Sequence, residues 1–294
     1  MKNSHTLKLK VILMVLFIIT ITSSSFTYYN NLSSGPKDPI KLSYSFNDGK
    51  SISYLYSTAV TQNMDVNGQT INVLNNIDLA FSAKMTGKSD QNLKVQITID
   101  SLSTKVESMQ GTSGGKIKDV AGKSFNMIVS PLGKEIDVAE AEKLEYSVDG
   151  TQQSNLSQFF THIFADLPEN AIKVGDTWTK NDTITNKTST SNTKQIVKST
   201  NKFEGLEQVN GMECAKISSA VTGTLESTVQ NNGMDILITG PVQGTVTIYF
   251  AVSKGYLVKQ EVLTKMTGTV EITGAQNMSF PITMETSNKI IAGK

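Results

Sequence analysis

The chain has no arginine, and all 27 of its basic residues are lysine. A guanidinium group binds phosphates and guanine edges through paired, planar hydrogen bonds that an ammonium group cannot reproduce. The lysines are balanced by 26 acidic residues and form no basic cluster along the sequence. We therefore expect no nucleic-acid partner.

Histidine and cysteine are almost as scarce. The two histidines are His5, in the N-terminal segment, and His162, and the single cysteine is Cys214. With so few of these residues, a zinc site built from several histidines and an intramolecular disulfide are both excluded. Cys214 lies in a strand-like stretch without a neighbour that would lower its pKa, so we expect a buried, unreactive thiol. We expect neither a metal site nor a cofactor.

The N-terminal segment has the layout of a secretion signal. Three lysines precede an apolar run over residues 11–21, and four hydroxyl residues follow it. The run is shorter than the about 20 residues of a spanning helix, so we expect cleavage after Ser25. An uncleaved anchor is the alternative, and it would be the only contact with a membrane. The expected location is extracellular or in the cell envelope.

We divide the chain into a signal segment at 1–25, a polar tether at 26–39 and one β-rich domain at 40–294. From residue 40 onward apolar and polar residues alternate, as in the stretch from Leu93 to Asp100. This period of two is typical of half-buried strands, and turn dipeptides such as Asn67-Gly68 indicate antiparallel hairpins. The predicted fold is an antiparallel curved sheet or open barrel of roughly a dozen strands. One or two short helices should pack on it.

A single stretch departs strongly from the period of two. Its apolar residues are Leu156, Phe159, Phe160, Ile163 and Phe164, which would share one face of a helix. Pro168 should end this helix, and a second short helix is predicted over residues 138–146. We expect the first helix to cover an apolar face of the sheet. A lid over a ligand cavity is the alternative.

The C-terminal half contains a weak internal echo. Segments 221–225, 242–246 and 266–270 each carry a Gly-Thr pair, and their glycines are 21 and 24 residues apart. This spacing fits successive hairpins in which each glycine permits a bend or a bulge. Chance matches in a β-rich composition are the alternative reading.

Recognisable catalytic patterns are missing. His162 has no evident nucleophile partner, and the sequence contains neither a phosphate-binding glycine loop nor a metal-binding His-Glu-x-x-His helix. The acidic stretch from Glu135 to Asp149 is expected to be a solvated surface rather than a calcium site or a catalytic acid pair. We name no catalytic residue and expect a protein that is not an enzyme.

The segment from Leu167-Pro168 to Val174-Gly175-Asp176-Thr177-Trp178 resembles an uncharacterised family of bacterial exported proteins and lipoproteins. In that family a β-rich half ends in a helix and a Leu-Pro turn, and a Val-Gly-Asp-x-Trp motif opens a second β-rich half. The resemblance covers the chain from Lys41 onward. More remotely, the exported β-rich plan with short helices resembles the curved half-barrel of periplasmic lipoprotein carriers and related lipid-binding proteins, which is an analogy of fold. The chain departs from the family because it lacks the cysteine of an N-terminal lipid anchor.

Trp178 is the only tryptophan in the sequence. We expect it to anchor the start of a strand, with Gly175 and Asp176 making the preceding turn and the carboxylate accepting backbone N–H groups. Contact with a ligand is the alternative.

The leading functional hypothesis is an exported, non-catalytic protein that binds an apolar small molecule such as a lipid. The alternative is a structural or protein-interaction domain at the cell surface, with an envelope protein as its partner. A hydrolase using two carboxylates ranks third. If a ligand binds, the candidate contacts are Phe159, Phe160, Ile163, Phe164 and Trp178.

Overall fold

The computed structural model describes residues 38–46, 49–148, 152–187, 190–231, 233–274 and 277–293. The predicted signal segment 1–25 and residues 26–37 of the predicted tether lie outside the described residues. Within the described residues, no helix combines the length and apolar character needed to cross a bilayer.

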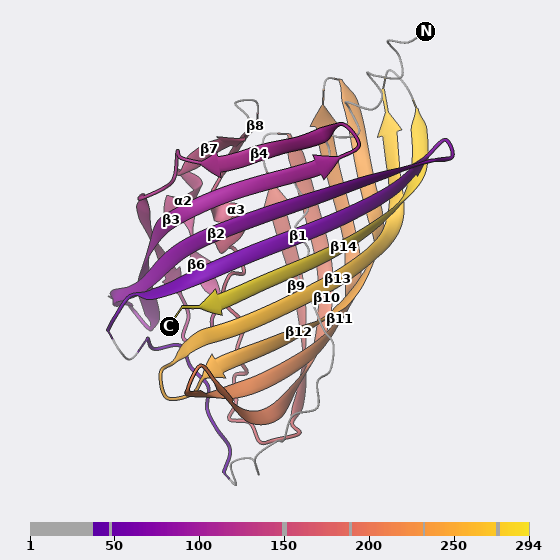
Figure 1. The fold of residues 1–294 in the computed structure, drawn as a ribbon. Coiled ribbons are helices and arrows are strands. Elements are labelled where there is room, and N and C mark those ends of the chain that lie inside the picture. The colour runs from indigo at the N-terminus through magenta and orange to yellow at the C-terminus, as the bar shows by residue number, and fades with distance from the viewer. Residues whose placement is uncertain are drawn as a thin grey trace.

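The described part of the chain contains fourteen strands and two short helices (Figure 1). The first strands are β1 (Ile52–Val66), β2 (Gln69–Ser89), β3 (Asn92–Ser108), β4 (Gly111–Ile117), β5 (Ser124–Val129) and β6 (Glu135–Asp137). They are followed by α2 (Ala139–Glu142), β7 (Glu145–Val148), β8 (Gln152–Asn155) and α3 (Ser157–Phe160). The remaining strands are β9 (Thr177–Lys187), β10 (Ser191–Val209), β11 (Met212–Asn231), β12 (Met234–Ala251), β13 (Tyr256–Thr273) and β14 (Met278–Ala292).

Twelve of these strands form one curved sheet in the order β6-β5-β3-β2-β1-β14-β13-β12-β11-β10-β9, with β4 beside β3. Every pairing within the sheet is antiparallel, and hairpins join most neighbours. The sheet does not close into a barrel: β9 forms one edge, while β4 and β6 lie at the other. The predicted fold class is therefore confirmed.

Alternation along the strands gives the sheet one buried face. In β3, for example, Val95, Ile97 and Ile99 are completely buried, whereas Lys94 before them and Gln96 between them are exposed. The buried side chains form two clusters at different ends of the long strands. The main core includes Phe81, Phe160, Phe203 and Phe250, and the second core includes Met64, Ile71, Ile236 and Met284. The predicted period of two thus produces the interior of the fold.

Two glycines of the internal echo lie where neighbouring backbones come unusually close. A Cβ atom on Gly268 would lie 2.0 Å from the carbonyl oxygen of Thr239, and one on Gly223 would lie 2.2 Å from that of Ile196. Beside Gly268 the β12–β13 pairing skips Gly240 and the following proline. Only glycine fits such an approach, but only Gly268 lies at an irregular point, because the pairing of Gly223 with both neighbouring strands is regular.

The helices are shorter than predicted. α3 has four residues, because Thr161 is extended and His162 adopts a left-handed φ of 72°. Ile163 and Phe164 therefore follow the helix instead of continuing its stripe, although both side chains are buried. α2 covers only 139–142 of the predicted 138–146, and Tyr146 belongs to β7. Apolar residues at helical spacing do not require a helix here, because a turn followed by an extended segment buries the same side chains. Tertiary packing therefore overrides the helical spacing.

The chain from β6 to β9 forms an insertion on the buried face of the sheet. It contains α2, the β7–β8 hairpin and α3, and Figure 1 shows these elements beside β3 and β4. The insertion then leads through residues 161–176 to the edge strand β9.

Candidate functional site

A cleft of about 840 Å³ lies between the buried face of β9–β12 and the segment 162–172. We call this segment the roof and the cleft the first cleft. The floor of the first cleft is made by side chains at adjacent positions on successive strands. Across these strands Trp178 pairs with Asn201, Asn201 with Ser219, and Ser219 with Val246. The edge strand β9 contributes most because every second residue points inward. The apolar part of the lining includes Phe164, Leu167, Trp178, Val221, Val246 and Ile248.

The turn before β9 has the geometry predicted from the Val-Gly-Asp-x-Trp motif. Gly175 has a φ of 91°, which suits glycine, and the carboxylate of Asp176 accepts a hydrogen bond of 2.8 Å from the backbone N–H of Lys173. Trp178 follows as the second residue of β9, half-buried against the main core. It therefore has the predicted anchoring position and also lines the first cleft.

A charged cluster stands on one wall of the first cleft. The ammonium group of Lys180 contacts Asp166 of the roof and lies 2.9 Å from the carboxylate of Asp182 on β9. Burial alone would lower the pKa of Lys180, but hydrogen bonds and the charges of the two aspartates raise it above its ordinary value. The three groups are each about a third exposed, so their pairing contributes little stability. They instead place charges of both signs on one wall of a lining that also includes Lys134, Glu169 and Asp176.

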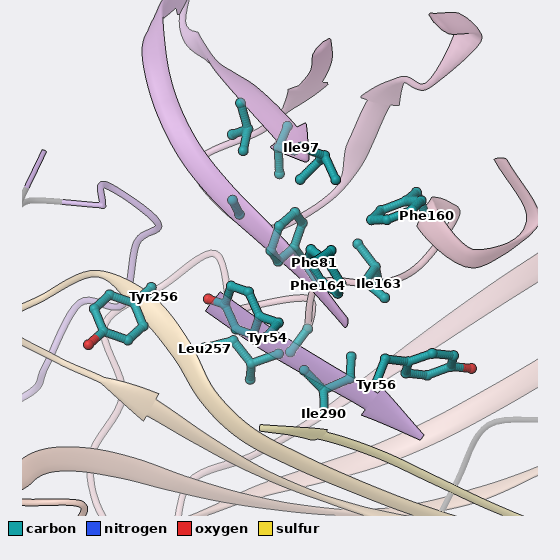
Figure 2. Close-up of a cluster of buried hydrophobic side chains, with 14 of the residues drawn as sticks. Tyr54, Tyr56, Phe81, Ile97, Phe160, Ile163, Phe164, Tyr256, Leu257 and Ile290 are labelled. Atoms are coloured by element: carbon teal, nitrogen blue, oxygen red, sulfur yellow. The ribbon is translucent and has the colours of Figure 1, made fainter. Parts of the chain in front are cut away.

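The roof is fixed by the main core. Figure 2 shows Phe160, Ile163 and Phe164 among the side chains of the sheet. The ring of Phe160, in α3 directly before the roof, meets those of Phe81 and Phe125 edge-on, with centroid distances of 5.2 and 4.9 Å. The ring of Phe164 likewise lies 5.5 Å from that of Tyr44.

Backbone hydrogen bonds fix the roof as well. The N–H of Leu167 donates to the carbonyl of Leu132 at 2.8 Å, and Ile172 exchanges two bonds with Ile40. The hydroxyl of Tyr44 donates to the carbonyl of Ala165 at 3.1 Å. With both its side chains and its backbone held in this way, the roof is a fixed wall of the cleft.

A second cleft of about 320 Å³ lies on the other side of His162. One wall comes from Tyr56, Phe159, Ile163 and Ile290 of the main core and α3 region. The opposite wall comes from the inward positions of β9 and β10, namely Ile184, Asn186, Thr193 and Gln195. His162 and Ile184 line both clefts.

The five ligand-contact candidates are thus divided among different surroundings. Phe164 and Trp178 line the first cleft, and Phe159 and Ile163 line the second. Phe160 is completely buried and serves the packing of the roof.

The sequence reasoning missed the charged cluster. Lys180 and Asp182 follow Trp178 at alternate positions, so the strand period alone would have placed all three on one face. Asp166 could not be assigned in this way, because its approach to Lys180 depends on the path of the roof.

Glu135 is the exception within the acidic stretch that was predicted to be solvated. Glu140, Glu142 and Glu145 are exposed as expected, but Glu135 lies against the roof and accepts a 2.9 Å hydrogen bond from the N–H of Phe164. Burial raises the pKa of Glu135 to about 8, although that hydrogen bond opposes the shift. A carboxyl group held in this way remains protonated at neutral pH.

Two further predictions concern reactive groups. Cys214 is buried, and burial raises the pKa of its thiol to about 11, which confirms the expected unreactive cysteine. Within the described ranges, no group of three or more histidine, cysteine, aspartate or glutamate side chains is placed to hold a metal ion.

Comparisons with known proteins give little direct guidance. A scan against protein-family models finds no match, and no curated protein matches significantly. Among solved structures, the chain is similar to OccK2 (OpdF) of Pseudomonas aeruginosa in complex with glucuronate, with 4% identity, coverage of 83% of this chain and 98% of that chain, and a TM-score of 0.20. It is also similar to a DUF1329 family protein of Desulfovibrio piger, with 12% identity, coverage of 83% and 88%, and a TM-score of 0.14. A third similar structure is a candidate outer membrane lipoprotein-sorting protein domain of Vibrio parahaemolyticus, with 8% identity, coverage of 82% and 83%, and a TM-score of 0.12. Likenesses with TM-scores this low carry no functional argument, so the function has to be inferred from the clefts themselves.

Proposed function

We propose that this chain is an exported, non-catalytic binding protein and that its first cleft holds an apolar or amphiphilic molecule such as a lipid. The observation that carries the proposal is the space of about 840 Å³ between an inward sheet face and a fixed roof. Ligand sites of this kind are concave, mainly apolar and largely preformed, with a few polar groups that orient the ligand. The first cleft has these properties.

The distribution of charge favours an amphiphile over a pure hydrocarbon. Val221, Val246 and Ile248 offer apolar surface on the floor, while Lys180 and its two aspartates stand at the wall. A ligand with an apolar chain and a polar head would satisfy both regions. A hydrocarbon without a head would leave the charged groups facing apolar surface, which is unfavourable.

The geometry also supports a role without catalysis. Of the four carboxylates in the lining of the first cleft, those of Asp166 and Asp182 pair with Lys180 and that of Asp176 accepts a hydrogen bond from the N–H of Lys173, while Glu169 is exposed, so no carboxylate there is held as a buried acid or base. The raised pKa of Glu135 is caused by its burial, and this carboxyl group lies outside the lining of the cleft. We propose that any contact with a membrane is made by the N-terminal segment, if that segment is retained.

The test is native mass spectrometry of protein purified from a membrane-containing host, with lipid extraction to identify the adduct. We expect a bound apolar species in the wild-type protein. The variant Ser199→Phe places a ring at an inward, half-buried position of the floor and should lose this species, since the ring occupies the same volume. Thr200→Phe, at the next and outward-facing position, is the matched control and should keep it.

A uniformly ligand-free wild-type protein would contradict the proposal. Crosslinking in the native envelope then addresses the alternative, because a structural or interaction domain must give a reproducible protein partner. Under that alternative, the protein partner would bind at the edge strand β9, whose outward residues are exposed.

A further inference from the structure

The second cleft, of about 320 Å³, has two walls of different character. One wall is apolar and consists of the buried side chains of Tyr56, Phe159, Ile163 and Ile290. Most of the remaining lining is polar, and it includes the amide side chains of Gln158, Asn186 and Gln195. A molecule that fills this cleft therefore has to meet apolar surface on one side and hydrogen-bonding groups on the other.

The pairing of β9 with β10 gathers the polar side chains of this cleft. Asn186 pairs directly with Thr193, and the neighbouring pair is Ile184 with Gln195. Paired residues on one face of a sheet have their Cβ atoms about 5 Å apart, so these four inward side chains form a compact patch. The hydroxyl of Thr193 is fixed in turn by that of Ser227 on β11, at an oxygen–oxygen distance of 2.7 Å.

The amide groups of this cleft have unused hydrogen-bonding capacity. The side chain of Gln195 is only 6% exposed, yet its amide makes no hydrogen bond within the described residues. Such a buried amide normally has a partner, because its removal from water is otherwise costly. The nitrogen of Gln158 donates to the hydroxyls of Tyr146 and Ser154, which leaves its carbonyl oxygen available to accept a bond.

These groups match the hydroxyl groups of a sugar. Amides both donate and accept hydrogen bonds, as sugar hydroxyls do, and the C–H groups on the face of a sugar ring can pack on the apolar wall. The charged lining residues Glu142 and Lys187 are both exposed, so a charged ligand would find no buried counter-charge. The volume is near the lower end of the range of about 300–1,000 Å³ for small-molecule sites, which suits a compact ligand.

We infer that the second cleft is a binding site for a neutral mono- or disaccharide. The amides of Asn186 and Gln195 bind its hydroxyl groups, and the apolar wall packs against one face of its ring. The inference concerns a different cleft from the one assigned to an apolar or amphiphilic ligand. It therefore goes beyond the proposed function and does not depend on it.

The experiment is saturation-transfer NMR of the protein with four neutral sugars, namely the methyl glycosides of glucose, galactose and mannose, and N-acetylglucosamine. At least one of them should bind saturably, with more saturation on the C–H groups of one ring face than on those of the other. Cyclohexanol, which has a ring but a single hydroxyl, should bind at least about tenfold more weakly. Glucuronate, which adds a negative charge, should also bind more weakly.

Gln195→Leu removes the buried amide and keeps a side chain of similar size. We expect it to weaken sugar binding by about tenfold, because a hydrogen-bonding partner of the ligand is lost. Its resistance to chemical denaturation should equal or exceed that of the wild-type protein, since the amide has no partner within the described part of the fold. Gln208→Leu, at an exposed position of the same strand, is the matched control and should bind like the wild-type protein.

Asn186→Leu makes the corresponding change on the edge strand. It should likewise weaken sugar binding by about tenfold, because Asn186 lies beside Thr193 in the polar patch. Asn181→Leu, at an exposed, outward position of β9, is its matched control and should stay within about twofold of the wild-type affinity.

Several results would overturn the inference while leaving the proposed function in place. The first is an absence of saturable binding for all four sugars. The second is wild-type affinity in both Gln195→Leu and Asn186→Leu, which would place the sugar elsewhere. Equally tight binding of cyclohexanol or glucuronate would show that the amides do not select a neutral sugar. A clear loss of stability in Gln195→Leu would show that its amide serves the fold instead.

Discussion

Replacing Phe160 by alanine is expected to lower the free energy of unfolding by about 3–5 kcal/mol. The side chain is completely buried, and its ring contacts Phe81 of β2 and Phe125 of β5. Alanine would remove these contacts and leave a cavity that the long, paired strands cannot close. The loss is measured by chemical denaturation followed by circular dichroism.

Leu263→Ala is the control for this variant. Leu263 is a large apolar residue on β13 that remains 42% exposed, so its truncation should cost well under about 1 kcal/mol. A loss of similar size in the two variants would mean that α3 is not anchored in the core. The roof of the first cleft would then no longer be a fixed wall, and the case for a preformed site would weaken.

Replacing Glu135 by glutamine is expected to stabilise the protein at alkaline pH. The folded protein holds the pKa of Glu135 at about 8, mainly through burial, whereas the unfolded chain has an ordinary carboxyl group. Between about pH 4.5 and 8 the folded state therefore keeps a proton that the unfolded state releases. The stability that this proton provides is fully present below the unfolded pKa and is lost as the pH rises through the folded pKa.

Glutamine removes this dependence and keeps the hydrogen bond, because its amide oxygen can accept from the N–H of Phe164 as the carboxyl oxygen does. Glu135→Gln should match the wild-type protein near pH 4.5 and exceed its free energy of unfolding by on the order of 3 kcal/mol above pH 8. Denaturation midpoints measured at several pH values test this. Glu142→Gln, which removes an exposed carboxylate of the same stretch, should not reproduce the effect. A constant difference between Glu135→Gln and wild type at all pH values would contradict the expectation.

The β fold could be predicted because it depends on a local pattern. Alternation such as that of Val95, Ile97 and Ile99 fixes which face of a strand is buried, and Asn-Gly turns such as Asn67-Gly68 fix antiparallel neighbours. The length of α3 could not be predicted in the same way. Apolar residues at helical spacing can also be buried by a turn followed by an extended segment, which is how Ile163 and Phe164 reach the core.

The candidate site was only partly accessible from the sequence. Trp178 could be selected because it is unique and follows a turn motif, and its strand position follows from that motif. The contact between Asp166 and Lys180 depends on the path of the roof, and so does the contact between Glu135 and the N–H of Phe164. Such contacts join residues that are far apart in the sequence, and neither the period of two nor the spacing of charges predicts them.

The central claim is that the space beneath the roof receives an apolar chain, and the fluorescence of Trp178 tests it most directly. Titration with an acyl-chain amphiphile that carries bromine along its chain should quench the emission of Trp178 in a saturable manner, and the unlabelled amphiphile should reverse it by competition. Ser199→Phe, which fills the floor of the first cleft, should abolish this quenching. Emission that stays unchanged at every concentration of the labelled amphiphile would contradict the claim.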